Sequence, residues 1–168
     1  MKRIGLSVLL MLAGQCVSAE TKATFKVQAT IANGCGLSNV EQRLDFGQHP
    51  GVVQGQLKGY VINTAQSWNI RCTERLPVKV MLNGGDHFSN NSRRMKHAQQ
   101  NEFVPYQLYQ DSFLKSEYAS GSTYSLSPTT VLNSVLGFAV YGVADLNNNN
   151  QPRSAGIYKD MVAITITW

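Results

Sequence analysis

The chain has 168 residues, of which 43% are hydrophobic, with 15 basic against 10 acidic side chains. Its length suits one domain with a single core. The basic residues are spread along the chain apart from Arg93, Arg94 and Lys96, and no aromatic residues interleave with that cluster. This pattern argues against binding to nucleic acid, and we expect no nucleic-acid partner.

Residues 1–19 have the features of a secretory signal peptide. Two basic residues precede an apolar run, residues 4–13, that is too short to span a bilayer. Small residues, Val17 and Ala19, stand where signal peptidase requires them, so we expect a mature chain that begins at Glu20. No later stretch is long and apolar enough for a transmembrane helix, and we expect no membrane span.

Residues 23–31 are an alternating stretch at the start of the mature chain. The apolar positions alternate with polar ones and are Ala23, Phe25, Val27, Ala29 and Ile31. Because successive side chains of an extended chain point to opposite faces, this period predicts a β-strand with one apolar face. The stretch is tethered only at its C-terminal end, so it could pair with its own domain or with a neighbouring molecule.

Two cysteines, Cys35 and Cys72, remain in the mature chain. An exported protein reaches an oxidising compartment, so we expect one disulfide between them. On the loop-entropy argument this bridge would stabilise the fold by about 3 to 4 kcal/mol. Cys16 leaves with the signal, and Gln15 before it does not suit lipidation. The histidines are scattered without ligand spacing, and we expect neither a metal nor a cofactor.

From Cys35 onward the chain is a series of short β-like runs separated by glycine, asparagine and proline, with no convincing helix. The strands expected are residues 42–46, 59–62, 68–72, 77–82, 103–109, 129–132, 136–143 and 161–168. Residues 116–128 are expected to form a loop with a short strand. Such strands and one disulfide predict an all-β protein with an immunoglobulin-like β-sandwich.

Other segments carry more local expectations. Residues 86–101 are polar and predict a surface excursion or an edge hairpin, with Arg93 and Arg94 in a solvated loop. Pro105 lacks an N–H and favours an edge strand or a strand beginning. Residues 147–150 are expected to be an exposed turn. In the strand expected at residues 68–72, Trp68, Ile70 and Cys72 share one face. In the strand expected at residues 161–168, the residues that share one face are Val162, Ile164, Ile166 and Trp168.

Strands of the same alternation therefore occupy both ends of the mature chain. A sandwich that stops at an unpaired terminal strand exposes a backbone edge and part of its apolar interior, and a further strand laid alongside is the usual remedy. The N-terminal stretch has the pattern needed for that role.

Eight short motifs, in this order and spacing, resemble the spore-coat-protein-U type domain, a family that includes subunits of archaic chaperone–usher pili. They cover nearly the whole mature chain and are Ile31 with Cys35, Leu44-Asp45-Phe46-Gly47, Ile70-Arg71-Cys72-Thr73, Leu82-Asn83-Gly84-Gly85, Arg94-Met95, Tyr106-Gln107-Leu108-Tyr109-Gln110-Asp111, Val140-Tyr141-Gly142 and Gly156-Ile157-Tyr158-Lys159-Asp160.

The resemblance implies an incomplete immunoglobulin-like fold that lacks its last strand. A periplasmic chaperone would lend a strand during export, an outer-membrane usher would assemble the fibre, and the N-terminal arm of the next subunit would replace the lent strand. On this view residues 1–19 are the signal, 20–33 the donor arm and 34–168 the sandwich. Two departures are Val143-Ala144, where the family often has proline, and the small Ala29.

The resemblance also assigns roles to residues. Cys35 and Cys72 would form the structural disulfide, and the carboxylate of Trp168 could anchor a basic chaperone residue. The donated side chains would be Phe25, Val27, Ala29 and Ile31. The edge of the acceptor groove would be formed by Val162, Ile164, Ile166 and Trp168. In a competing register, residues 27–31 form the subunit's own first strand.

The function expected is that of a structural subunit, shaft or minor adaptor, of a secreted cell-surface pilus with a role in adhesion and biofilm formation. The alternatives are a secreted lectin-like module or a coat protein whose fold is complete by itself. Trp68, Tyr106, Tyr109 and Tyr141 are expected to pack in the core rather than form a sugar platform. The sequence contains no catalytic motif. A glycosidase needs two carboxylates close together, whereas here the carboxylates are spread over separate expected strands, so the sequence does not support that activity. These carboxylates are Asp45, Asp86, Asp111 and Asp160.

Overall fold

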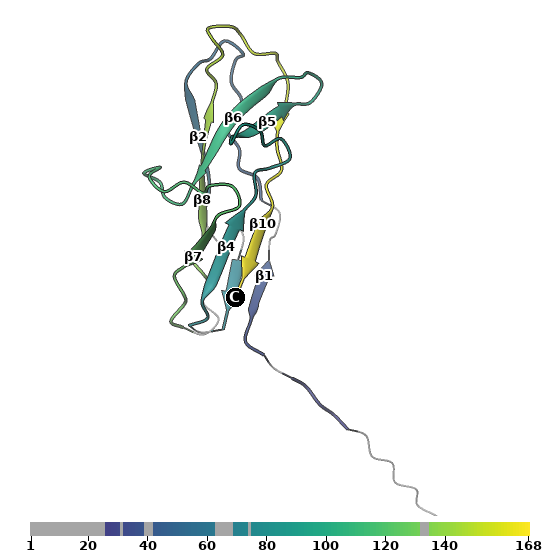
Figure 1. Ribbon diagram of the computed structural model, residues 1–168, viewed down its shortest axis with the longest axis vertical. Coiled ribbons are helices and arrows are strands. Elements are labelled where there is room, and N and C mark those ends of the chain that lie inside the picture. Colours follow the sequence, from purple (N-terminus) through teal and green to yellow (C-terminus); the bar gives the residue numbers. More distant parts are fainter. Residues whose placement is uncertain (1–25, 31, 39–41, 63–68, 74, 132–134) are drawn as a thin grey trace, which may run out of the picture. The chain divides into compact units, whose positions relative to one another are not determined.

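The computed structural model describes residues 26–30, 32–38, 42–62, 69–73, 75–131 and 135–168 (Figure 1). The chain divides into two units, residues 1–31 and 32–168. In the first unit, residues 26–30 are exposed and form no strand. The predicted signal peptide, Phe25, Ile31 and Trp68 lie outside the described residues.

Among the described residues of the second unit, the regular secondary structure consists of β-strands alone, as predicted. The strands are β1 (Cys35–Ser38), β2 (Gln56–Ile62), β3 (Asn69–Cys72), β4 (Val78–Leu82), β5 (Arg93–His97), β6 (Phe103–Tyr109), β7 (Thr123–Leu126), β8 (Ala139–Asp145), β9 (Tyr158–Lys159) and β10 (Ile164–Thr167).

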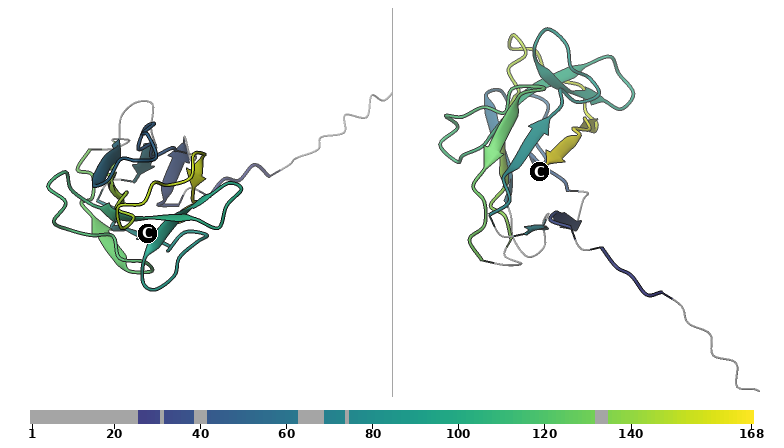
Figure 2. Two further views of the ribbon diagram at one scale, coloured as in Figure 1. Left: turned by 90° about the horizontal axis from the view of Figure 1, so that it is seen from above. Right: turned by 60° about the horizontal axis from the view of Figure 1, so that its bottom comes forward.

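All strand pairs are antiparallel. One sheet has the order β2-β8-β6-β5-β9, a second has the order β10-β4-β7, and β1 pairs with β3 in a small third sheet. The strands lie in layers (Figure 2). Inward-facing side chains of β4 meet those of β6 and β8 in one core, which makes the unit an immunoglobulin-like β-sandwich. The predicted fold class is therefore confirmed.

Alternation along the strands builds this core. On β4 and β6 every second residue is buried, and the residues between them are less so. Ile70 and Cys72 of β3 add to the core, as their shared face predicted. The buried residues on the two longer strands are Val78, Val80, Leu82, Val104, Tyr106 and Leu108.

Residues 42–46 are not the strand that was predicted. They have no strand partner among the described residues, yet Leu44 and Phe46 are half-buried against the core. Space for them comes from Gly59 and Gly142, which are register partners on β2 and β8. A Cβ atom on Gly142 would lie 2.9 Å from Leu44 Cδ2 and from Phe46 Cζ. The apolar alternation here reflects an extended segment packed over a sheet rather than paired within one.

Smaller differences concern strand ends. Residues 129–131 form no strand, and Leu132 lies outside the described residues. β8 begins at Ala139 rather than at residue 136, because Leu136 N donates to Ile70 O in an irregular segment. β9 was not predicted as a separate strand. The short strand expected within residues 116–128 is β7.

Of the two positions predicted for Pro105, an edge strand or the beginning of a strand, the edge is wrong, whereas Pro105 does lie near the beginning of its strand. Its strand, β6, lies between β8 and β5 inside the five-stranded sheet. Pro105 faces Arg94 of β5, whereas pairing with β8 begins only at Tyr106. The proline therefore stands just outside the β8 ladder, where a missing N–H costs no hydrogen bond of that ladder.

The solvated loop predicted around Arg93 is also wrong. Arg93 lies on β5 and is only 3% exposed. Its guanidinium donates from Nε and Nη2 to Asn83 O, at 3.0 and 2.8 Å, and from Nη1 to Tyr118 O at 2.7 Å. The buried cation thus ties the end of β4 and the segment before β7 to β5.

A candidate binding groove between two strand edges

An apolar groove lies between β10 and β1, which run side by side (Figure 1). It encloses about 200 Å³. Every side chain around it is apolar or a disulfide cysteine, and the lining residues are Cys35, Leu37, Ile70, Ile164, Ile166 and Trp168. Such a groove suits an extended apolar segment rather than a charged ligand.

Both strands that border the groove are at sheet edges. β10 pairs with β4, and β1 pairs with β3; in the part of the chain that the structure describes, neither has a second strand partner. A free edge presents backbone N–H and C=O groups that can bond another strand. The groove therefore offers backbone partners along its rims as well as an apolar floor.

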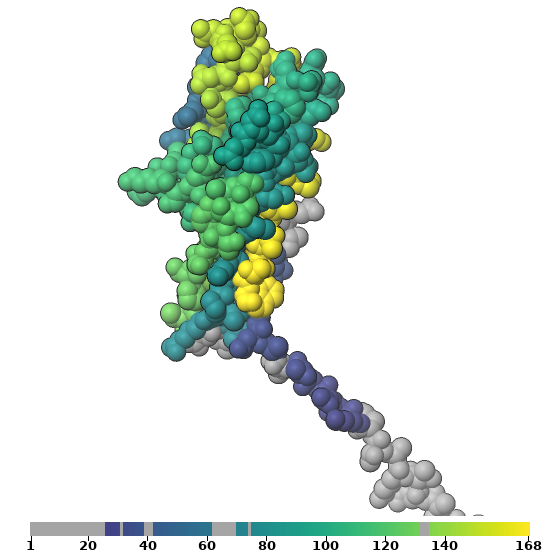
Figure 3. Space-filling view, in the orientation of Figure 1, coloured from purple at the N-terminus to yellow at the C-terminus, as the bar shows by residue number. Residues whose placement is uncertain are grey.

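The pleat of β10 points its apolar side chains to the groove. Ile164 and Ile166 are half-buried, while Thr165 and Thr167, which alternate with them, are exposed. Two larger side chains leave much apolar surface open, since Trp168 is 59% and Leu37 is 47% exposed. Figure 3 shows the end of β10, in yellow, on the molecular surface.

Hydrogen bonds before β10 fix the position of that strand. Asn83, at the end of β4, donates its N–H to Ala163 O at 3.0 Å, and its Oδ1 accepts from Ala163 N at 2.9 Å. Asp160, whose side chain is almost fully buried, accepts from Tyr106 Oη at 2.6 Å and from the backbone N–H of His87 at 3.2 Å. The approach to β10 is thereby fastened to β4 and β6.

Burial and the hydrogen bond to Asp160 also change the pKa of the Tyr106 hydroxyl. Desolvation raises the pKa of Tyr106 well above its ordinary value, and the hydrogen bond to the Asp160 carboxylate raises it further. Tyr106 therefore stays protonated and keeps donating its hydroxyl proton to Asp160.

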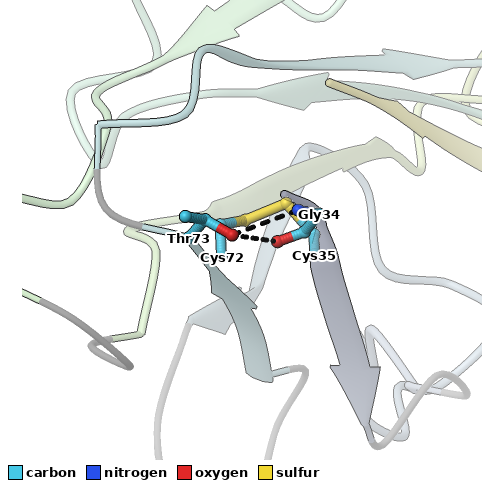
Figure 4. The surroundings of a disulfide bond; sticks show 4 residues. All are labelled: Gly34, Cys35, Cys72 and Thr73. Atoms are coloured by element: carbon cyan, nitrogen blue, oxygen red, sulfur yellow. Dashed lines mark hydrogen bonds between the residues drawn. A yellow bond between two sulfur atoms is a disulfide. The ribbon is translucent and has the colours of Figure 1, made fainter. Parts of the chain in front are cut away.

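The other rim is held by the disulfide. Cys35 and Cys72 are direct register partners on β1 and β3, with their Cα atoms 4.0 Å apart, and they are bonded as predicted. Thr73 adds to this link: its Oγ1 accepts from Gly34 N at 3.1 Å and its N–H donates to Gly34 O at 3.0 Å (Figure 4).

The structure brings together most of the residues predicted for the groove edge. Ile164, Ile166 and Trp168 line it, whereas Val162 is half-buried against the core and is not among the lining residues. Sequence reasoning missed Leu37 and Ile70. Leu37 could have been found from its two-residue spacing from Cys35, which places both side chains on one face of a strand.

The remaining predicted residues have other positions. Val27 and Ala29, expected in the donor arm, are exposed in the first unit. Asp45 accepts from Gly47 N, and Asp111 accepts from the N–H groups of Phe113 and Ser116, so these carboxylates brace turns. Among the described residues no cluster of three or more acidic, histidine or cysteine side chains could hold a metal. Nor does that part of the chain contain a helix of membrane-spanning length and hydropathy.

Comparison with known proteins gives one family and several structural neighbours. The family model described as Spore Coat Protein U domain matches residues 21–165. No curated protein matches the chain significantly.

Two solved structures are similar in part. One is the CsuC–CsuE chaperone–tip adhesion subunit pre-assembly complex from archaic chaperone–usher Csu pili of Acinetobacter baumannii, with 22% identity and a TM-score of 0.49 over 83% of this chain. The other is a chaperone–tip adhesin complex of CFA/I fimbriae biogenesis, with 16% identity and a TM-score of 0.48 over 79% of this chain. The matches span 40% and 41% of those chains.

Proposed function

The chain belongs to the Spore Coat Protein U domain family, and on that premise we propose that it is a structural subunit of a chaperone–usher pilus that polymerises by donor-strand exchange. The observation that carries the proposal is the apolar groove between the free edges of β10 and β1. An extended segment laid in this groove can bond both edges and cover the exposed side chains at once.

The N-terminal arm, residues 20–33, has the pattern that such a segment needs. Its apolar residues recur at every second position, about 7 Å apart in an extended chain. The groove residues of β10 and β1 recur with the same period. A strand of this register would direct its apolar side chains to the groove floor and its polar ones, such as Lys26 and Gln28, to solvent. The donated side chains would be Phe25, Val27, Ala29 and Ile31.

An empty groove also gives a reason for assembly partners. Leu37 and Trp168 expose apolar surface next to unpaired backbone, a combination that favours uncontrolled association. In this proposal a periplasmic chaperone covers the groove after export, an outer-membrane usher releases it, and the arm of the next subunit replaces the chaperone. The mature subunit, a shaft or minor adaptor, then serves adhesion or biofilm formation within a cell-surface fibre.

The test uses the arm as a separate peptide. The chain is produced without residues 20–33, and a synthetic peptide of those residues is titrated in. We expect saturable binding and a higher melting temperature, because the peptide binds only the folded chain. A peptide with its apolar positions replaced by serine is the control, and it should neither bind nor stabilise.

Neighbouring residues on β10 provide a matched pair of variants. Ile166→Asp puts a charge into the groove and should abolish peptide binding, because burying an unpaired carboxylate is strongly unfavourable. Thr165→Asp places the same charge on the opposite, exposed face and should leave binding within a few-fold of wild type. Equal binding by the two variants, or binding of the serine peptide, would refute donor-strand exchange in this groove.

A further inference from the structure

The outer face of the five-stranded sheet carries features that the groove does not explain. Cross-strand partners share a face of a sheet, so Tyr60 of β2, Tyr141 of β8 and Tyr109 of β6 form one row across three neighbouring strands. The core packing predicted for Tyr109 and Tyr141 is therefore wrong, because their strands turn both rings to the outer face and only Tyr106 to the core. The rings of Tyr60 and Tyr141 are 6.3 Å apart between centroids, and Tyr60 is 66% exposed. We call these three residues the tyrosine row.

A polar pocket of about 410 Å³ adjoins the tyrosine row on the same face. Its floor includes Val143 and Gln107, which lie two residues from Tyr141 and Tyr109 on their strands, so all four side chains point to one side. Its walls come from the loops around residues 88–92 and 117–120. The volume lies within the range of small-molecule sites.

Hydrogen bonds link the row to the pocket. Tyr109 Oη donates to Gln107 Oε1 at 3.1 Å, and Gln107 Nε2 donates to Glu117 Oε2 at 3.5 Å. Burial and the Glu117 carboxylate raise the pKa of Tyr109, so its hydroxyl keeps this proton. The amide, the carboxylate and the phenol are thereby oriented side by side, with further donor and acceptor capacity toward the pocket.

The charge of the pocket narrows the class of ligand. Its lining includes the carboxylates Glu117 and Asp145 and one cation, Arg93. The Arg93 guanidinium is buried and already donates to the backbone carbonyls of Asn83 and Tyr118. The pocket lining therefore offers hydroxyl, amide and carboxylate partners, and its two carboxylates disfavour a phosphate, sulfate or acidic sugar. Lys58, the register partner of Val143, is exposed on the same face outside the pocket lining, where its ammonium is a further donor for a sugar hydroxyl.

We propose that the tyrosine row and the adjoining pocket bind a neutral oligosaccharide. Pyranose rings have an apolar C–H face that stacks on tyrosine rings and hydroxyl groups at their rim that pair with amides and carboxylates. The row supplies the stacking surface, and Gln107, Glu117 and Asp145 supply hydroxyl partners. This site lies on a different sheet from the β10 edge and does not depend on the function proposed for the groove.

The test is isothermal titration calorimetry of the full exported chain with cellopentaose, chitopentaose and maltopentaose. We expect saturable binding of at least one in the millimolar range or tighter. Tyr60→Ala and Gln107→Ala, both at exposed positions that leave the core intact, should each weaken it about tenfold. Phe113→Ala removes an aromatic ring that is even more exposed than Tyr60 and lies outside the row, and it should leave affinity unchanged.

The possible outcomes are decisive. Loss of affinity in the two site variants but not in Phe113→Ala supports the site. Absence of binding by all three sugars overturns the proposal, as does binding of dextran sulfate in their place. Sugar affinity that survives both site variants would place any binding elsewhere on the molecule and would equally overturn it.

Discussion

Glu102 connects two segments that are distant in the sequence. It lies in the turn between β5 and β6, and its carboxylate accepts from Ser154 Oγ at 2.6 Å, Ser154 N at 3.1 Å and Tyr158 Oη at 2.7 Å. These bonds, those of Ser154 first, lower the pKa of Glu102 to about 2. They fasten the chain before β9 to the sheet, and burial together with this carboxylate raises the pKa of Tyr158 to about 12.

The depressed pKa predicts an acid-dependent contribution to stability. An unfolded glutamate has a pKa of about 4.3, so the folded state holds the proton less tightly. The stabilisation is complete above that value and is lost as the pH falls toward about 2. Glu102→Gln should lower the free energy of unfolding at pH 7 and match wild type near pH 2, as urea unfolding at a series of pH values would measure.

A less severe change provides the control for this prediction. Ser154→Ala removes one of the three hydrogen bonds to the Glu102 carboxylate and leaves the charge of Glu102 in place. The free energy of unfolding of this variant, followed against pH, should therefore lie between those of wild type and Glu102→Gln. An unchanged slope between about pH 4 and 2 in Glu102→Gln would mean that this carboxylate does not carry the effect.

Arg93 shows what the sequence cannot reveal about single residues. It stands beside Arg94 in a polar stretch, and no local pattern distinguishes them. The structure buries Arg93 among backbone carbonyls, whereas Arg94 lies over the Phe103 ring at 4.3 Å and donates to His87 O. The partners of Arg93 come from β4 and from the segment before β7, so only the tertiary fold determines which arginine points inward.

At the scale of elements, two glycines let an unpaired segment replace a strand. Gly59 and Gly142 face each other across β2 and β8, and residues 44–46 lie over them. A Cβ atom at Gly59 would approach Asp45 O to 2.8 Å, and this neighbour is backbone that cannot rotate away. Glycine is therefore required at both positions because residues 44–46 pass close to the backbone there, and not because of the backbone angles of the glycines.

This packing predicts a specific sensitivity to one methyl group. Gly59→Ala should lower the free energy of unfolding by about 2 kcal/mol, because the segment over it must shift and Leu44 and Phe46 lose contacts. Gly137→Ala is the control: its Cβ would meet nothing within 4 Å, and stability should stay within about 0.5 kcal/mol. Urea unfolding of both variants measures the difference, and equal effects would contradict the role given to residues 44–46.

Periodicity predicted the elements that are buried on one side. β6 has the predicted bounds, and β4 and β10 lie within their predicted ranges, because their apolar residues alternate without interruption. Periodicity failed for residues 42–46, since an extended segment lying on a sheet alternates in the same way. It also left the region of β5 undecided between a surface excursion and an edge hairpin, and it missed β9, because the outward positions of both strands carry charged side chains as a loop does.

For the whole molecule, the small sheet of β1 and β3 forms one wall of the groove. The sequence indicated the disulfide and three groove residues, two on β10 and Trp168 just after it. It could not indicate the opposite wall, because Leu37 and Ile70 become groove residues only when β1 lies beside β10. The Cys35–Cys72 bond joins positions 37 residues apart and holds that wall by covalent means.

Removal of the disulfide should therefore affect both stability and the groove. The double variant Cys35→Ser, Cys72→Ser opens a loop whose closure contributes about 3 to 4 kcal/mol on the loop-entropy argument, so urea unfolding should show a loss of that order. Binding of the peptide of residues 20–33 to the arm-deleted chain should weaken as well, because β1 loses its fixed register with β3.

Thr73→Val is the comparison for this prediction. It keeps the disulfide but loses the side-chain hydrogen bond with Gly34, which should lower the free energy of unfolding by about 1 kcal/mol. Full stability with weakened peptide binding in the double variant would show that the bond shapes the groove alone, whereas lost stability with wild-type peptide affinity would remove β1 from the acceptor site.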